Sequence, residues 1–178
     1  AITVGDGTLT SKSIFGNISY NLSDKVTLDF GGRYYEDEKS ALVSVDSVTF
    51  VDKTGGFDNT SLRGALSYAL ADNANIYASV SQGFRSGGLN FFSPLDYEPE
   101  ELISYEVGVK GMFFDNKLSA EAALYLSDYT NYQARSTDSA GLTITSNPGE
   151  AEIQGIEWST LWTLSDYFSL GFNGNYTE

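Results

Sequence analysis

The sequence contains no cysteine and no histidine, and only 3 prolines and 1 methionine among its 178 residues. The lack of cysteine excludes a disulfide framework and a thiolate metal site. The lack of histidine removes the commonest general base and the commonest metal ligand. The sequence therefore argues against a hydrolytic triad and a zinc centre, and we expect neither an enzyme nor a resident cofactor.

Positive charge is also scarce: 10 Lys and Arg residues stand against 24 Asp and Glu residues, giving a net charge of −14. Contacts to nucleic-acid phosphates need clustered Lys and Arg, and here these residues are scattered. We therefore expect no nucleic-acid partner and interpret the acidity first as a source of solubility.

Long apolar runs are missing as well. No stretch approaches the ~20 apolar residues of a membrane helix, so membrane insertion would need strands of roughly 9–11 residues. The first residues, AITVGDGT, lack the basic start and apolar core of a signal peptide, so we expect a mature or excised chain.

What the sequence does have is a two-residue alternation, clearest over Ser104 to Leu126. It predicts a β-hairpin with Asp115 and Asn116 at the centre of a tight turn, since both residues tolerate a positive φ. One face is then apolar, and the other carries charge, glycine and serine. The predicted cross-strand pairs are Tyr105 with Leu126, Val109 with Ala122, Phe113 with Leu118 and Lys110 with Glu121.

The same unit of strand, short turn and strand recurs every ~45 residues. The other predicted strands are Ser11–Leu22, Val26–Tyr34, Leu62–Leu70, Ile76–Val80, Ile156–Leu164 and Phe168–Tyr176. Long connections are predicted over Glu36–Asn59, Gly83–Glu101 and Asn131–Glu150, the first with a possible strand around Ala41 to Val51 and a break at Gly55-Gly56. Because Ile153 is out of phase with Ile156, we also expect a β-bulge near Gly155.

Short turns on one rim and long loops on the other are typical of an outer-membrane β-barrel with periplasmic turns and extracellular loops. A soluble sandwich or lipocalin is the alternative, because it buries its apolar face in protein. The polar composition of the second face and the aromatic residues near strand ends favour the membrane. We predict an all-β, antiparallel transmembrane segment of about eight strands from a larger barrel, with residues 1–178 in one domain. A self-contained barrel of eight strands remains the alternative.

Three segments resemble the β-barrel of TonB-dependent outer-membrane receptors of the iron-complex type. They are IYASVSQGFRSGGLN (76–90), PEELISYEVGVKGMFFDNKLSAEAALYLSDYTNYQ (99–133) and NPGEAEIQGIEW (147–158). The resemblance implies a barrel of about 22 strands with a plugged lumen. It implies import of ferric siderophores or similar scarce solutes, driven by an inner-membrane TonB complex. The plug and the box that binds TonB are absent from this sequence, so lipid, the remaining strands and the plug are the expected partners.

Four residues are candidate ligand contacts. Arg85 suits an anionic ferric complex, although an ion pair with a neighbouring carboxylate is the plainer interpretation. Phe91, Phe92 and Tyr97 suit stacking on an aromatic chelator. They suit equally well a role in packing their loop onto the rim.

Other charges are expected inside the barrel or on its surface. Lys110 with Glu121 and Arg33 with Asp29 are predicted ion pairs of the lumen. Carboxylates between Glu36 and Asp58 offer oxygen ligands for Ca²⁺, but the chain has no D-x-D-x-D-G loop, and a solvated acidic surface is the favoured interpretation.

Three functions compete at this stage. The first is transport, as part of a ligand-gated importer, and the second is a small barrel with a structural or adhesive role. The third, an outer-membrane lipase or protease, is disfavoured because the chain has no histidine. Only the first requires a larger barrel with a plug.

Overall fold

The computed structural model describes residues 3–46, 48–91, 93, 95–137, 139 and 141–178. These residues form eight β-strands, and they contain no helix long and apolar enough to cross a membrane. The strands are β1 (Thr3–Asn21), β2 (Val26–Val45), β3 (Val48–Ala71), β4 (Ala74–Arg85), β5 (Glu100–Phe113), β6 (Leu118–Thr137), β7 (Thr143–Ser165) and β8 (Phe168–Thr177).

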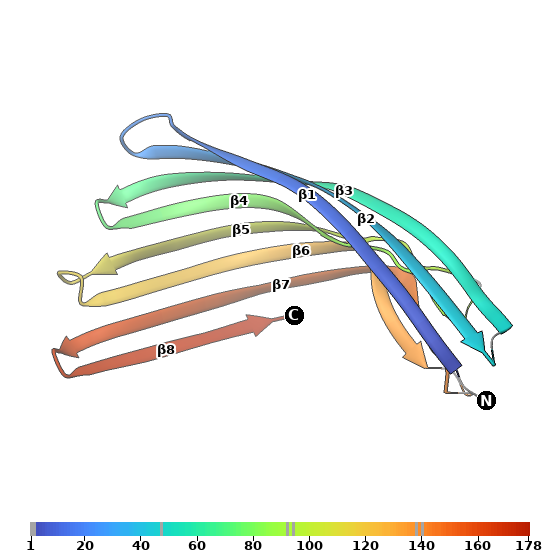
Figure 1. Cartoon of the computed structure of the whole chain (residues 1–178). Coiled ribbons are helices and arrows are strands. Elements are labelled where there is room, and N and C mark those ends of the chain that lie inside the picture. The colour runs from blue at the N-terminus through green and yellow to red at the C-terminus, as the bar shows by residue number, and fades with distance from the viewer. Residues whose placement is uncertain (1–2, 47, 92, 94, 138, 140) are drawn as a thin grey trace.

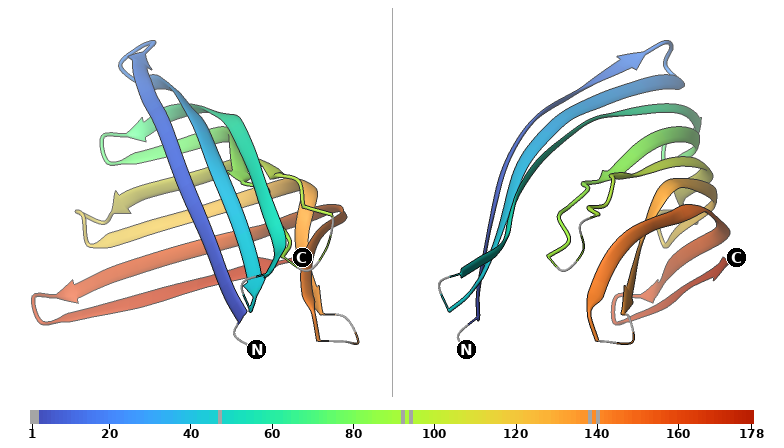
Figure 2. Two further views of the ribbon diagram at one scale, coloured as in Figure 1. Left: turned by 45° about the vertical axis from the view of Figure 1, so that its right-hand side comes forward. Right: turned by 90° about the vertical axis from the view of Figure 1, so that its right-hand side faces the viewer.

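The strands form one antiparallel sheet in which each strand pairs with its neighbours in sequence, in the order β1 to β8. The sheet is strongly curved and has a concave and a convex face (Figures 1 and 2). Among the described residues, β1 and β8 form the two edges and do not pair with each other. The predicted all-β barrel segment is confirmed, and the open sheet favours a larger barrel over closure at eight strands.

The hairpin of β5 and β6 has the predicted register. Phe113 lies opposite Leu118, and Lys110 lies opposite Glu121. Asp115 and Asn116 have φ values of 55° and 64°, as a turn with two left-handed central residues requires. The first hairpin is also in its predicted register across β1 and β2.

Most apolar residues of the strands lie on the convex face of the sheet, and no second layer of the described chain covers them. Val107 is 44% exposed, Leu124 54% and Phe172 63%, although each lies within a regular strand. The buried apolar residues of the described chain are four small ones: Ala41, Val43, Ala74 and Ala123. A soluble sheet would bury its apolar face against a second layer. The convex face therefore has the composition of a surface that contacts lipid.

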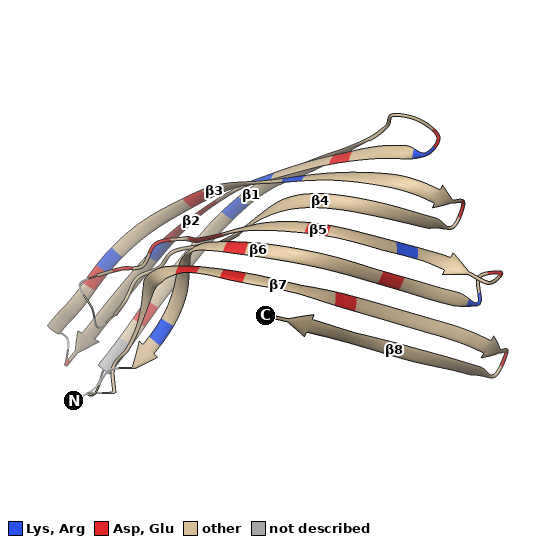
Figure 3. Ribbon diagram, turned by 180° about the vertical axis from the view of Figure 1, so that it is seen from behind, with Lys and Arg blue, Asp and Glu red and all other residues tan. Residues whose placement is uncertain are grey.

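The apolar band of the convex face ends at a definite level along the strands. On β2 it runs from Val26 to Tyr34, and the next outward residue is Glu36, which pairs with Lys12 of β1 at 3.5 Å. On β5 the band stops at Ile103, below Glu101. Charged residues lie on β1 to β3 and also on β5, β6 and β7, whereas β8 carries none (Figure 3). The ends of the strands distal to the short turns therefore extend out of the apolar band.

Two of the predicted long connections are largely strand, and this corrects the sequence-based boundaries. The segment 36–59 belongs largely to β2 and β3, which pair past Gly55 and Gly56 as far as Val45 and Val48, with a register shift between Val43 and Ser44. Most of Asn131–Glu150 likewise belongs to β6 and β7. Beyond the apolar band both faces are polar, so a strand there lacks the alternation that reveals it.

The predicted bulge near Gly155 is wrong. The pairing of β6 with β7 is continuous there, and Ile153 lies opposite Ser127 on the concave face. The register shifts instead between Tyr129 and Ala134. Ile153 is out of phase because it is an apolar residue on the polar side of the sheet.

Candidate functional site

The connection between β4 and β5, residues 86–99, lies inside the concave side of the sheet. We call it the strap; residues 92 and 94 lie outside the described residues. It occupies the space between the wall made by β2 and β3 and the wall made by β6 and β7 (Figure 2). Side chains from both walls hold it in place.

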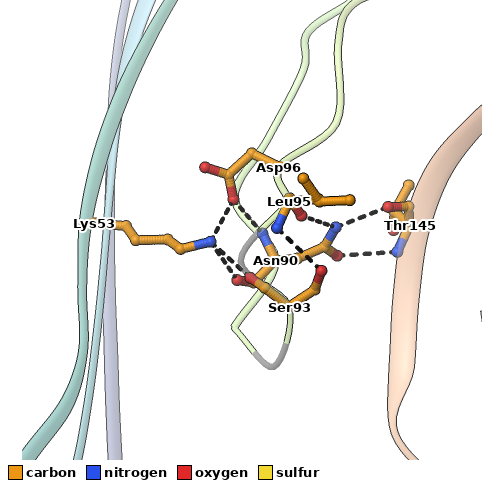
Figure 4. A network of polar contacts seen from close by, with 6 residues as sticks. All are labelled: Lys53, Asn90, Ser93, Leu95, Asp96 and Thr145. Carbon is orange, nitrogen blue, oxygen red and sulfur yellow. Dashed lines mark hydrogen bonds and ion pairs between the residues drawn. The ribbon is translucent and has the colours of Figure 1, made fainter.

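Lys53 of β3 holds the distal part of the strap from one side. Its ammonium group donates to the carbonyl oxygens of Asn90 and Ser93, at 3.1 and 2.8 Å, and forms an ion pair with Asp96 at 2.7 Å (Figure 4). The Lys53 side chain is 22% exposed and that of Asp96 is 39% exposed. An ion pair so open to water contributes only about 0–1 kcal/mol.

Asn90 joins the strap to β7. Its side-chain amide donates to the carbonyl of Thr145 at 2.7 Å and accepts from the Thr145 N–H at 2.9 Å. The same amide donates to the carbonyl of Leu95, and the Asn90 N–H donates to Asp96. Asn90 is 7% exposed. This single buried residue therefore bonds to two other residues of the strap and also to β7, which faces Lys53 across the concave side.

Gln133 of β6 holds the two ends of the strap. Its side-chain amide lies within 3.3 Å of the carbonyl oxygens of Arg85, Ser86 and Glu98. Its N–H donates to the carboxylate of Glu100 at 2.6 Å. Gln133 is 6% exposed, and loss of its amide would leave buried carbonyls unpaired, at a cost of about 1–3 kcal/mol.

Two further contacts complete the anchoring. Asn147 of β7 accepts from the N–H of Glu98 and donates to its carbonyl, at 2.8 and 3.1 Å. Lys39 of β2 donates to the hydroxyl of Ser86 and to the carbonyl of Gly87, and it pairs with Asp37 at 3.3 Å. Lys39 thus reaches only the first residues of the strap.

The strap is narrow because of its glycines. Gly88 and Tyr97 exchange two backbone hydrogen bonds of 2.9 and 3.0 Å. A side chain at Gly88 would collide with the ring of Tyr97, and one at Gly87 would collide with Phe57 of β3. Two adjacent glycines therefore let the strap fold back on itself against the wall.

The four candidate ligand contacts have different surroundings in the structure. Phe91 is 40% exposed, whereas Tyr97 packs on Gly88 within the strap. Arg85 is exposed, and no carboxylate lies within 4 Å of it in the described part of the chain. Phe92 lies outside the described residues. A ligand role for any of the four stays a prediction.

A hollow of about 670 Å³ lies on the sheet next to the strap. Its lining includes Arg33, Arg63, Phe15, Tyr35, Phe84 and Ser86. Neither arginine has a carboxylate within 4 Å among the described residues. Arg33 donates to Ser13 at 3.3 Å and lies 5.4 Å from the centre of the Tyr35 ring. The hollow thus combines positive charge with aromatic surface.

The expected lumen pairs are neighbours or share a strand, but they are not in direct contact. Lys110 lies opposite Glu121, yet its ammonium group is 5.5 Å above the centre of the Tyr77 ring. Asp29 and Arg33 share β2, and the ion pairs within 4 Å that the described residues form are elsewhere. Ring contacts of this kind attract a cation without a carboxylate.

The acidic segment between Glu36 and Asp58 does not gather into a cage. Asp37 lies on the concave side with Lys39, whereas Glu36 and Lys12 pair on the convex side. Across the described residues, no group of three or more carboxylates is arranged to hold a metal ion. The alternation of the strands distributes these side chains between the two faces.

Sequence reasoning missed Lys53, Asn90 and Gln133, which hold the strap. Lys53 and Gln133 fall within two of the predicted long connections, where no alternation indicates a face. Asn90 carries no motif. The adjacent glycines Gly87 and Gly88 were the one indication of the strap in the sequence, because such a pair often marks a backbone that packs closely against another segment.

The sequence of this chain is similar to those of known bacterial receptors. A family model described as "TonB dependent receptor-like, beta-barrel" matches residues 2–178. The pesticin receptor of Yersinia enterocolitica is 26% identical over 182 residues, which cover 97% of this chain and 26% of that receptor. A probable TonB-dependent siderophore receptor, PiuA of Acinetobacter baumannii, is 24% identical over 97% of this chain and 24% of its own length.

Two crystal structures have the same fold over nearly the whole chain. The ferric yersiniabactin uptake receptor FyuA of Yersinia pestis superposes with a TM-score of 0.83 at 22% identity, covering 98% of this chain and 27% of FyuA. The structure of PiuA gives the same TM-score and identity, and the matched region covers 98% of this chain and 26% of PiuA. The chain therefore spans only 24–26% of the length of these curated relatives.

Proposed function

Because this chain belongs to the TonB-dependent receptor family, as part of its β-barrel, we propose that it forms one side of a receptor that imports ferric siderophores or similar scarce solutes. The family's members, and this chain with them, are bacterial outer-membrane proteins. The observation that carries the proposal is that the sheet has its apolar residues on the outer, convex face and its polar residues on the inner, concave face. Its apolar convex face suits lipid, and its polar concave face holds a strap that suits a lumen through which a solute passes.

The solute class is supported by two features of the concave side. Phe91 offers an exposed aromatic ring, and the hollow with Arg33 and Arg63 offers guanidinium groups without carboxylate partners. Aromatic rings stack on aromatic chelators, and guanidinium groups bind carboxylates and other planar anions. The relatives named for ferric yersiniabactin and for siderophores point to the same class.

The proposed partners follow from the two edges and the two faces. Further strands of the same receptor would pair with β1 and β8, and lipid would cover the convex face. A plug would lie against the concave face, and the TonB complex would act through segments outside this chain. The ferric complex is cargo, so no resident cofactor is proposed, and the relatives are transport receptors, not enzymes.

The test uses the whole receptor that contains this chain. Iron-starved cells with and without the receptor are given a panel of siderophores loaded with radioactive iron. We expect uptake of at least one that requires both the receptor and an intact TonB complex. Uptake of the whole panel at the same rate without the receptor would refute the proposal.

A further inference from the structure

We propose that the strap is a hinged partition of the lumen. It stays attached to β6 and β7, and it is latched to β3 by Lys53, which releases when a solute passes. This inference rests on the proposed transport function, because it assigns a moving part to that passage.

The position of the strap makes it an obstacle. Viewed from the side of the long connections, it lies between the β2–β3 wall and the β6–β7 wall (Figure 2, right). Hydrogen bonds join it to both walls, through Lys53 on one side and Thr145 on the other (Figure 4). A bulky solute that moves along the concave face must therefore displace the strap or pass around it.

The strap touches β3 near Gly87 and Leu89 through Phe57 and Gly55, but the polar contact of its distal part with β3 is the one that is easily broken. A single ammonium group holds all three strap oxygens there, and it does so at the end of a long, flexible side chain. Both members of its ion pair are open to water, which can replace each partner. Lys39 contacts only Ser86 and Gly87, next to the end of β4, and does not restrain the distal strap.

The contacts with β6 and β7 are of a different kind. Asn90 and Gln133 are buried and use their amides on main-chain groups. Asn147 makes a similar two-way bond with Glu98. The bonds of Asn147 are exposed, but separating the buried amides of Asn90 and Gln133 from their partners would leave buried polar atoms unpaired. That costs more than hydrating an exposed ion pair. The strap should therefore leave β3 first and turn about its attachment to β6 and β7.

The first test locks the latch. This chain has no cysteine, so Lys53→Cys with Asp96→Cys adds the only thiols within it. In a receptor whose other segments are also made cysteine-free, a short bis-thiosulfonate linker that a reductant removes can join these two thiols. We expect linked cells to bind the ferric solute but to lose its uptake, and reduction to restore uptake. Uptake by the linked receptor at the unlinked rate would overturn the proposal, as would loss of binding.

The matched control applies the same linker to Lys12→Cys with Glu36→Cys. These residues also form an ion pair between strands, but on the convex side and away from the strap. We expect uptake by this linked receptor to equal that of the unlinked one. Equal loss of uptake in both linked receptors would mean that the linker itself, and not the locked strap, stops import, and would remove the support for a latch.

A second readout does not depend on transport. A spin label at Leu95→Cys, which is 75% exposed in the strap, reports strap motion in the purified receptor. We expect Lys53→Met to increase the mobility of the label, whereas Lys12→Met should not. Unchanged mobility in Lys53→Met would overturn the latch even if import is confirmed. If no siderophore is imported, only the proposed function fails, because this measurement still reports on the latch.

Discussion

Among the glycines that lie within strands on the concave face, Gly155 of β7 has the least space for a side chain. A Cβ built there would collide with the carbonyl oxygen of Tyr176 on β8 and would lie 2.6 Å from the hydroxyl of Tyr125 on β6. The carbonyl belongs to the backbone of the neighbouring strand and cannot turn aside. We predict that Gly155→Ala destabilises the folded receptor by about 1–3 kcal/mol, the usual cost of overpacking.

The matched control is Gly16→Ala on β1, since no atom lies within 4 Å of a Cβ built there. Thermal unfolding of the purified receptor, followed by the heat-dependent shift of its gel mobility, measures both variants. Equal midpoints for the two would show that β7 and β8 separate enough to admit a side chain.

Single residues were the least predictable part of the site. Phe91 was predicted from the sequence as a ring that stacks on an aromatic chelator or packs its loop onto the rim, but its exposure depends on how the strap folds. Lys53 and Gln133 have common side chains at positions with no pattern, and only the fold brings them to strap residues 35 or more positions away in sequence. A contact of that range has no local signal.

At the scale of a strand, the two faces of β5 predict opposite responses to the same substitution. Val107 is near the middle of the convex apolar band, between Ile103 and Phe113. We predict that Val107→Arg costs about 2–4 kcal/mol, because it places a charge in the hydrocarbon layer. Folding into lipid vesicles, titrated with urea, measures the loss.

The control for this substitution is Ser79→Arg on β4, which lies opposite Glu106 on the concave face at nearly the same depth. An arginine there faces a carboxylate and water rather than lipid, so we expect little change in stability. If Ser79→Arg were the more damaging of the two, the assignment of the faces would be reversed.

The register of the hairpins was predictable because one face of each strand must be apolar. A shift of one residue in β5 would move Val109 to the polar side and Lys110 into the apolar band, so the pattern permits a single pairing. The upper parts of β2 and β3 have no such constraint. There, Glu36 and Asp37 are both polar although they point to opposite faces, so the sequence indicated only a possible strand around Ala41 to Val51 within a long connection.

At the scale of the whole molecule, the open edges of the sheet govern how this chain behaves by itself. β1 and β8 carry backbone groups that no strand of the described chain pairs on their outer sides, and such edges recruit other strands. We predict that residues 1–178, produced alone and refolded in detergent, associate into heterogeneous oligomers. Size-exclusion chromatography with light scattering measures this, with the whole receptor as the control. A uniform monomer would show that the sheet can close at eight strands.

The sequence by itself determined the class of the fold, the strand order and the pairing within the apolar band. It did so because lipid on one side and water on the other force a period of two, which can be seen in any single strand. Only the tertiary structure decided how far β2, β3, β6 and β7 extend and where the strap lies. These features depend on contacts such as Lys53 with Asp96 and Asn90 with Thr145, between residues that become neighbours only when the sheet curves.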